Sequence, residues 1–285
     1  MLRNLITYGL FPTTFSGAMA AAVWAMKRGV NPGLALAVIT AATIVIVAIA
    51  ERVSPAHPEW NRSRGDIVTD LWHGLVSNIT LPEVLKYGVM TGLLATGFAE
   101  SGGVGLWPDD WPLVAQLVAA LVLGQFGEYW AHRSLHEIPW LWRFHAVHHS
   151  PERLYFLNAA RFHPVDTSFL FCVGLAPLLV LGAGADLMLL VMTWISVHGL
   201  FQHCNVHLRL GPLNYIFSMA ELHRWHHSLD LSEANRNYGN NILFWDLVFR
   251  TVYWPRDRDA SSTIGNNIED YPKGYLGQLA APFRK

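Results

Sequence analysis

The sequence has few charged residues and almost no cysteine. Only 14% of its 285 residues are Asp, Glu, Lys or Arg, against a usual fraction of about 25%. Its two cysteines, Cys172 and Cys204, form no CxxC pair and are too few for a disulfide framework. The net charge is −1 and no basic patch stands out, which argues against a nucleic-acid partner. No linker and no short repeat divides the chain, so we expect one integrated domain.

Long uncharged runs replace the missing charge, and they cover residues 5–26, 31–50, 87–99, 111–127, 167–185 and 187–205. A bilayer core about 30 Å thick is crossed by roughly 17–25 apolar helical residues. We therefore expect an all-α, multi-pass membrane bundle of four to six helices. The last two runs flank Gly182 to Asp186 and predict a membrane hairpin near 167–203 that crosses twice or dips in and returns. Pro82 predicts that the third span begins late or breaks.

The charges at the ends of these runs predict the orientation. The segment 100–110 carries three acidic residues and no Lys or Arg, whereas arginines precede and follow it. By the positive-inside rule, this loop lies outside and the arginine-rich segments lie on the cytosolic side. We expect the membrane to be a bacterial cytoplasmic membrane. Lys27 and Arg28 fit only if the first two helices form a shallow hairpin. Residues 1–29 are interpreted as a retained membrane helix, since a second apolar run follows at once.

Ten of the fourteen histidines fall into four clusters, a pair followed by a triplet, twice over. The clusters are His132 and His136; His145, His148 and His149; His203 and His207; and His223, His226 and His227. Neutral imidazole is a ligand for iron, zinc, copper or nickel. Ten imidazoles are too many for one ion and suit two adjacent ions, with roughly five nitrogens each.

The spacing within the clusters matches one face of a helix. Residues three or four apart lie on the same face, with Cβ atoms about 5–6 Å apart. Each pair is spaced by four, and each triplet has the form HxxHH. The additional histidine of a triplet points aside by roughly 100°. One triplet is therefore able to reach two different ions.

Simpler interpretations fit the clusters less well. A structural zinc site is closed, four-coordinate and usually contains cysteine, and the HExxH spacing of zinc peptidases is absent. Isolated histidines are more often structural, an interpretation that covers His57 and His73, with His198 kept as a reserve ligand. Carboxylates and amides that accept the free ring N–H of a ligand histidine fix its tautomer. Candidates for such support are Glu128, Asn158, Arg161, His163, Asp166, Asn205, Glu221 and Asp246.

From Gly124 to Tyr253 the chain resembles the fatty acid hydroxylase / sterol desaturase superfamily of membrane di-iron enzymes. The resemblance is carried by residues 129–136 (YWAHRSLH), 141–150 (LWRFHAVHHS), 158–166 (NAARFHPVD), 223–228 (HRWHHS), and Asn237-Tyr-Gly239 leading to Trp245-Asp246. It implies two irons bound by the clustered histidines, although many relatives have a non-ligand at the position of His207. Many also have Pro shortly before the last triplet, here Ser218 to Glu221, and Gly at the position of Arg250.

The resemblance further implies a cytosolic helical cap that holds the dimetal site. The chain divides into N-terminal membrane helices (1–123), a histidine-cluster catalytic region (124–256) and a C-terminal tail (257–285). Dioxygen is the implied co-substrate. No haem or nicotinamide motif is visible, so electrons come from a separate ferredoxin-like or small haem protein with its reductase. Zinc is able to replace iron in purified protein.

We therefore predict a membrane-bound oxygenase that hydroxylates an unactivated C–H bond of a lipid taken from the bilayer. Three alternatives remain. A lipid or sterol desaturase would use the same site, a zinc-binding membrane protein would show no redox chemistry, and a hydrolase with a metal-bound water would turn over without dioxygen. The sequence identifies neither the lipid nor the oligomeric state.

Overall fold

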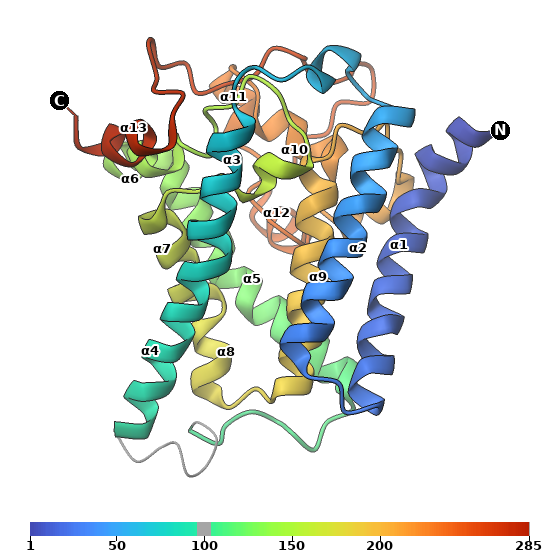
Figure 1. Ribbon diagram of the computed structural model, residues 1–285, viewed down its shortest axis with the longest axis vertical. Coiled ribbons are helices and arrows are strands. Elements are labelled where there is room, and N and C mark those ends of the chain that lie inside the picture. Colours follow the sequence, from blue (N-terminus) through green and yellow to red (C-terminus); the bar gives the residue numbers. More distant parts are fainter. Residues whose placement is uncertain (96–103, 285) are drawn as a thin grey trace.

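The computed structural model describes residues 1–95 and 104–284, and the secondary-structure elements of this part are helices. It contains no β-strand among these residues, only the isolated bridges Pro55–Val206 and Ser228–Ile264. Long helices run side by side, and short helices and loops cover one end of them (Figure 1). The all-α bundle with a helical cap is confirmed.

The bundle consists of α1 (Leu2–Lys27), α2 (Pro32–Val53), α3 (Ile67–His73), the π-helix η2 (Gly74–Thr80), α4 (Leu81–Ala95), α5 (Leu113–Glu137), α7 (Pro164–Gly174), α8 (Ala176–Leu181) and α9 (Ala185–His203). The cap consists of η1 (Pro58–Asn61), α6 (Pro139–His145), η4 (Phe156–Ala160), η5 (Gly211–Tyr215), α10 (Ala220–His226), α11 (Leu231–Ala234), α12 (Phe244–Phe249), α13 (Tyr275–Ala280) and η6 (Ala281–Phe283).

Four helical segments among the described residues are long and apolar enough to cross a membrane: Pro32–Val53, Leu113–Glu137, Pro164–Leu181 and Ala185–His203. The last two form the predicted hairpin, which turns at Gly182 with φ +99°. Pro82 is preceded by the π-helix η2, a local widening that accommodates a residue without a backbone N–H. This observation matches the predicted break in the third span.

The contact between α5 and α7 determines the position of the α5 histidines, His132 and His136. A Cβ added to Gly127 would lie 1.9 Å from the Val173 carbonyl oxygen, and one added to Gly124 would lie 3.1 Å from that of Gly174. Only glycine allows two helix backbones to approach so closely. The contact fixes the height of α5, with its histidines, against α7.

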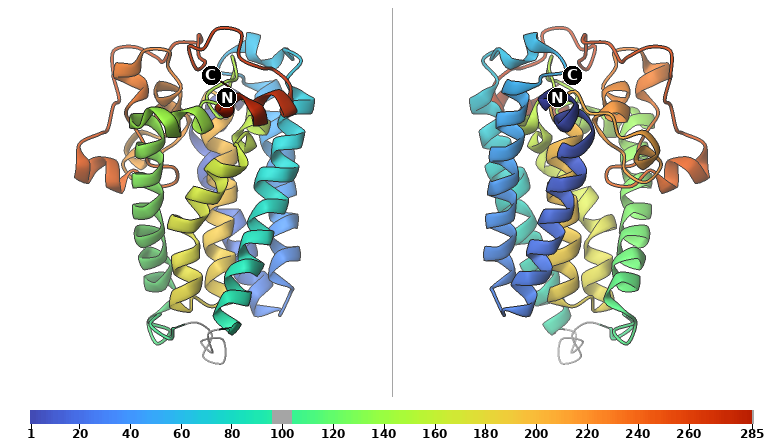
Figure 2. Two further views of the ribbon diagram at one scale, coloured as in Figure 1. Left: turned by 90° about the vertical axis from the view of Figure 1, so that its left-hand side faces the viewer. Right: turned by 90° about the vertical axis from the view of Figure 1, so that its right-hand side faces the viewer.

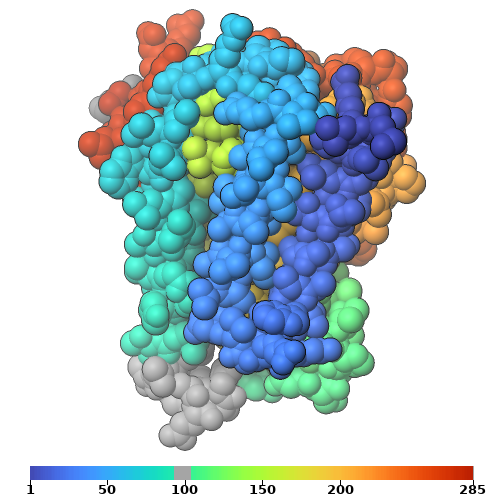
Figure 3. Space-filling view, turned by 45° about the vertical axis from the view of Figure 1, so that its right-hand side comes forward, coloured from blue at the N-terminus to red at the C-terminus, as the bar shows by residue number. Residues whose placement is uncertain are grey.

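Aromatic packing joins α1 to α9 and to the segment before α10. The Phe11 ring lies 5.3 Å from that of Phe201 and 5.0 Å from that of Phe217, both edge-on. Rings in this arrangement add about 0.5–1.5 kcal/mol beyond their buried area. In the space-filling view, α1 and α2 lie side by side, and the segment after α2 covers the capped end of α2 (Figure 3).

The C-terminal segment predicted as a tail packs on the cap. The Trp60 indole N–H donates to the Ser262 carbonyl (3.2 Å), and the Gln278 amide lies 2.9 Å from the His73 ring. Both chain termini lie at the capped end, whereas the turn between α1 and α2 lies at the opposite end (Figure 2). The expected division at residue 123 falls inside α5.

Candidate metal centre

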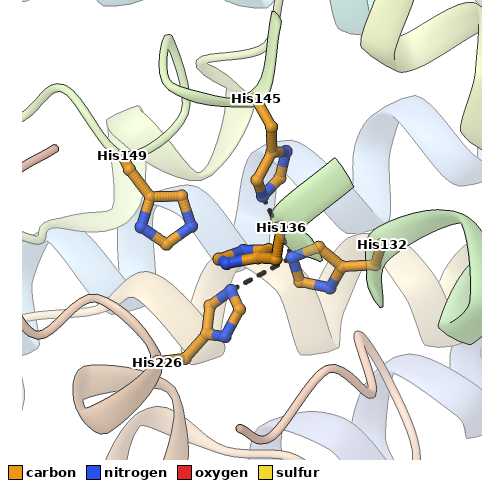
Figure 4. A group of neighbouring side chains, drawn as sticks. All are labelled: His132, His136, His145, His149 and His226. Atoms are coloured by element: carbon orange, nitrogen blue, oxygen red, sulfur yellow. Dashed lines mark hydrogen bonds between the residues drawn. The ribbon is translucent and has the colours of Figure 1, made fainter. Parts of the chain in front are cut away.

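Nine of the ten clustered histidines gather into two adjacent buried groups. The ligand atoms within each group all lie within 4.8 Å of one another, and no ring is more than 9% exposed. The first histidine group contains His132, His136, His145, His149 and His226, and the second contains His148, His203, His223 and His227. Figure 4 shows the first group, whose rings point toward a common centre from separate segments.

Each triplet is divided between the two groups, as its spacing predicts. The outer residues His145 and His149 belong to the first group, while His148 between them belongs to the second. The triplet of α10 is divided the other way, because His226 alone joins the first group. Each group therefore depends on both triplets, and this exchange holds the two groups side by side.

The protein fixes the tautomers of three rings in the first group. The Nδ1 atom of His132 lies 2.7 Å from the Tyr238 carbonyl oxygen, that of His145 lies 2.7 Å from an Asp166 carboxylate oxygen, and that of His226 lies 2.8 Å from the Arg236 carbonyl. These oxygens only accept hydrogen bonds. Each Nδ1 is therefore the donor, and each Nε2 carries the lone pair.

Those three lone pairs face one another. The Nε2 atom of His132 lies 3.0 Å from the Nε2 atoms of His145 and His226. With no proton between them, acceptors at this separation repel unless a cation lies at the centre. His136 and His149 also have buried Nε2 atoms without a hydrogen-bond partner among the described residues. The first group thus has the donor set of a transition-metal site.

The second group has similar support at two of its rings. The Nδ1 of His148 donates to the Arg161 carbonyl at 3.1 Å, and that of His203 to the Asn158 side-chain oxygen at 3.1 Å. Asn158 is itself held, because its oxygen accepts the Tyr155 backbone N–H. The Nε2 atom of His223 lies 2.9 Å from those of His203 and His227.

Burial keeps these rings neutral. For the six ligand candidates outside the membrane spans, desolvation and then the neighbouring imidazoles hold the pKa well below the usual 6.5: His145, His148, His149, His223, His226 and His227. A neutral imidazole offers a lone pair to a metal, whereas a protonated one does not.

His207 lies outside both groups. The HxxxH spacing places two rings on one face only while the helix continues, and α9 ends at His203, where Cys204 is extended. The His207 backbone N–H then donates to the Ser54 carbonyl, and its ring lines a surface cavity with His57 and Arg209. The reserve candidate His198 is buried against Phe11 and Phe217, and within the described part of the chain neither ring nitrogen has a hydrogen-bond partner.

Three of the predicted supporting residues contact a ligand ring, and the others do not. Asp166 and Asn158 act through their side chains, and Arg161 through its carbonyl. His163 instead caps α7, and Asn205 binds the backbone of His57.

The three remaining candidates do not touch a histidine of either group. Asp246 accepts the backbone N–H groups of Tyr238 and Gly239, so it holds the loop that supports His132. Glu221 binds Asn214 and Arg209. Glu128 accepts from the Gln125 amide on α5 and from the Asn240 amide in the loop before α12.

Three supporting groups had no clear signal in the sequence. Two are the carbonyls of Tyr238 and Arg236, which any residue type would supply. The third is the Asn235 side-chain oxygen, 3.2 Å from Nδ1 of His136. The run Asn235 to Asn241 contains four asparagines, and Asn237 has φ +52°, a conformation that asparagine tolerates better than most residues. The asparagines of that run are the sequence feature that indicated a loop with an unusual backbone conformation.

The geometry agrees with comparisons to known proteins. The sequence profile of the fatty acid hydroxylase family matches residues 117–251, a range that contains all nine grouped histidines. An ornithine lipid hydroxylase of Rhizobium tropici is 38% identical over 97% of this chain and 83% of its own length. The chain belongs to the fatty acid hydroxylase family.

More distant relatives match about half of the chain. Human alkylglycerol monooxygenase is 31% identical over 51% of this chain and 31% of its own length. Methylsterol monooxygenase 2-2 of Arabidopsis thaliana is 28% identical over 55% of this chain and 58% of its own length. No solved structure matches significantly.

The backbone conformation at Arg250 is one that suits the glycine of the family pattern. Arg250, where many relatives have Gly, follows α12 with φ +59° and ψ +38°. This left-handed conformation is the one that glycine adopts most easily at a helix C-terminus.

Proposed function

We propose that this chain hydroxylates an unactivated C–H bond of a membrane lipid at a centre of two iron ions. The observation that supports this most directly is the pair of adjacent all-imidazole groups, which exchange the middle histidine of each triplet. Family membership supports the same chemistry, since the relatives include a lipid hydroxylase and monooxygenases by name.

The donor set fits iron better than a structural zinc ion. Structural zinc sites are closed, four-coordinate and usually rich in cysteine, whereas the first group offers five nitrogens and neither group contains cysteine. When bound, the two irons would supply the activation of dioxygen and the removal of hydrogen from an unreactive carbon. The first histidine group would hold one ion and the second group the other.

The residues of the chain orient the histidine rings and exclude bulk water from them. Asp166, Asn158 and the carbonyls of Tyr238, Arg236 and Arg161 orient the rings. Orienting partners of this kind typically change metal affinity 10–100-fold. Burial of all nine rings excludes bulk water, which would otherwise consume reactive species.

We further propose that the lipid reaches the site from the bilayer and that the cap faces the cytosol. The arginines near the cap, and Asp109 and Asp110 at the opposite end of the bundle, agree with the positive-inside rule. Lys27 and Arg28, at the turn between α1 and α2, oppose it. Ornithine lipid is the first substrate to test, because the ornithine lipid hydroxylase of Rhizobium tropici is similar along nearly the whole chain. Electrons would come from a separate ferredoxin-like or small haem protein.

Lipid mass spectrometry tests this function. Extracts of a host that expresses the chain are compared with extracts of the same host without it, under isotopically labelled dioxygen. We expect one lipid to gain a labelled oxygen atom, and the gain to disappear in His148→Ala. A loss of two hydrogens in its place would identify a desaturase. Turnover without dioxygen would identify a hydrolase, and an unchanged lipid profile with tightly held zinc would identify a metal binder.

A further inference from the structure

Glu128 is a buried carboxyl without a charged partner. Its side chain lies inside the bundle on α5, and the residue is 8% exposed. One carboxyl oxygen accepts from the Gln125 amide at 2.6 Å and from the Asn240 amide at 3.4 Å. No Lys, Arg or His of the described residues forms an ion pair with it.

The other buried carboxylates of the described structure have partners of a different kind, although one oxygen of Asp166 has none there. Each has a cationic or imidazole partner, or at least two backbone N–H donors. The pairs are Asp70 with Arg161, Asp166 with His145, Glu233 with Arg258, Glu51 with the amides of Phe156 and Asn205, and Asp246 with those of Tyr238 and Gly239. Glu128 is the exception, and it belongs to the helix that carries two metal-ligand candidates.

An ionised carboxyl in this position costs several kcal/mol of desolvation unless a cation or further donors offset it. The two side-chain amides offset part of that cost. A positively charged ligand group would offset much more, because the attraction between charges is strong where water is excluded. The carboxyl therefore favours a cationic ligand over a neutral or anionic one.

The position of Glu128 links such a ligand to the proposed chemistry. Glu128 lies one helical turn before His132, a separation of about 5–6 Å between Cβ atoms. Its partner Asn240 belongs to the same loop as Tyr238, whose carbonyl fixes the His132 ring. Asn240 itself is half-buried. Glu128 is thus one helical turn from the first histidine group along α5, and its carboxyl contacts a partly exposed amide.

The surface beside this loop is apolar. On α12, Phe244, Leu247 and Val248 are 43–49% exposed. The Trp245 ring of the same helix lies 4.7 Å from Phe126 on α5, and its indole N–H donates to the Val122 carbonyl. An apolar surface next to a buried carboxyl suits a molecule with acyl chains and a cationic headgroup.

We infer that Glu128 binds the ammonium group of a cationic lipid headgroup and so positions the neighbouring carbon atoms at the first histidine group. This inference rests on the proposed function and narrows its substrate class to lipids that carry a free amine. Gln125 and Asn240 hold the carboxyl in place. Glu128 is thus a residue that determines specificity, and the metal ligands remain those named above.

A purely structural role makes a different prediction. The Glu128 side chain packs against Gly174 of α7, where an added Cβ would lie 2.6 Å from the Glu128 Cγ. If Glu128 only fills this space, Glu128→Gln preserves its shape and changes nothing. If its charge binds an ammonium group, the same substitution weakens binding of amine lipids alone.

The experiment measures binding and turnover separately. Purified protein in detergent is titrated with a short-chain ornithine lipid and with the same lipid after its amine has been acetylated. We expect wild type to bind the free amine at least about tenfold more tightly, and Glu128→Gln to lose this preference while its metal content and thermal stability stay unchanged. Glu128→Asp, which keeps the charge, should retain part of the preference. The matched control is Glu83→Gln, an exposed glutamate of α4 paired with Lys86, which should retain all of it.

The outcomes separate the two proposals. Equal binding of the two lipids by wild type, or an intact preference in Glu128→Gln, would overturn the role of Glu128. Should Glu128→Gln fail to fold, loss of the preference in Glu128→Asp would also count against it. A preference that depends on Glu128 without any oxygen gain in the lipid would support the binding site and contradict the hydroxylase function.

Discussion

The two histidine groups differ in how firmly the protein holds their rings. In the first group, three Nδ1 atoms donate to two carbonyls and a carboxylate that come from distant segments. In the second group, the Nδ1 atoms of His223 and His227 have no partner in the described structure. The first group is therefore the more preorganised of the two.

The second group depends instead on one loop. Residues 153–161 supply Asn158 for His203 and the Arg161 carbonyl for His148. This loop is attached to α3 and the residue before it by two ion pairs, Arg153 with Asp66 at 2.7 Å and Arg161 with Asp70 at 2.5 Å. A disturbance far from the histidines is thus expected to affect the second group before the first.

The largest effect should follow from removing the exchanged ligands. His148→Ala takes a ligand from the second group, and His226→Ala takes one from the first. We expect each to abolish turnover, because the proposed centre needs both ions, while the helical fold persists. Metal analysis should show that each variant loses about one of its two ions. His207→Ala, outside both groups, is the matched control and should retain turnover within about twofold. Turnover in both ligand variants would contradict the metal assignment.

The next largest effect should come from the ion pair that holds the loop. Asp70→Asn leaves Arg161 buried without its carboxylate, and breaking a buried pair in this way costs about 3–5 kcal/mol of unfolding free energy. Thermal unfolding in detergent should show the loss, together with preferential release of the ion in the second group. Glu152→Gln, at an exposed pair with Arg64, should change stability by no more than about 0.5 kcal/mol. Equal losses in the two variants would show that the loop needs no such anchor.

A smaller effect is expected from removing the hydrogen-bond acceptors of the histidine rings. Asp166→Asn removes a charged acceptor from His145, and Asn158→Ala removes a neutral one from His203. Because the charged hydrogen bond is stronger, we expect metal affinity to fall about 100-fold in the first variant and about tenfold in the second. Titration with a chelator measures both. A larger loss in Asn158→Ala would reverse the ranking of the two groups.

The smallest effect should occur outside both groups. Arg250 has φ +59° and is exposed, so Arg250→Gly relieves backbone strain and should raise stability by up to about 1 kcal/mol. Thermal unfolding checks this, with Arg250→Ala as the control that should bring no gain. Destabilisation or lost activity in Arg250→Gly would show that the arginine side chain has a role of its own.

The parts of the site that follow helical periodicity were predictable from the sequence. The spacing of three and four residues within each triplet is a local property, so the division of His145, His148 and His149 between two groups follows from a single turn of chain. The membrane hairpin was predictable for the same reason, since long uncharged runs on either side of Gly182 determine it.

Interactions between distant segments were not predictable. Whether His207 joins a group depends on where α9 ends, and the chain beyond that end pairs with Pro55, far away in the sequence. Every residue has a backbone carbonyl, so the sequence does not show that the carbonyl of Tyr238 accepts from a histidine ring. Glu128 was expected to support a ligand ring because it shares a helix face with His132, but its partners are amides.

The most direct test of the central claim is an anomalous-scattering map of the iron-loaded protein, recorded at the iron absorption edge. We predict two separate peaks, one inside the ring formed by His132, His136, His145, His149 and His226, and one inside the ring formed by His148, His203, His223 and His227. A single peak shared by both groups, or peaks at neither, would contradict the account.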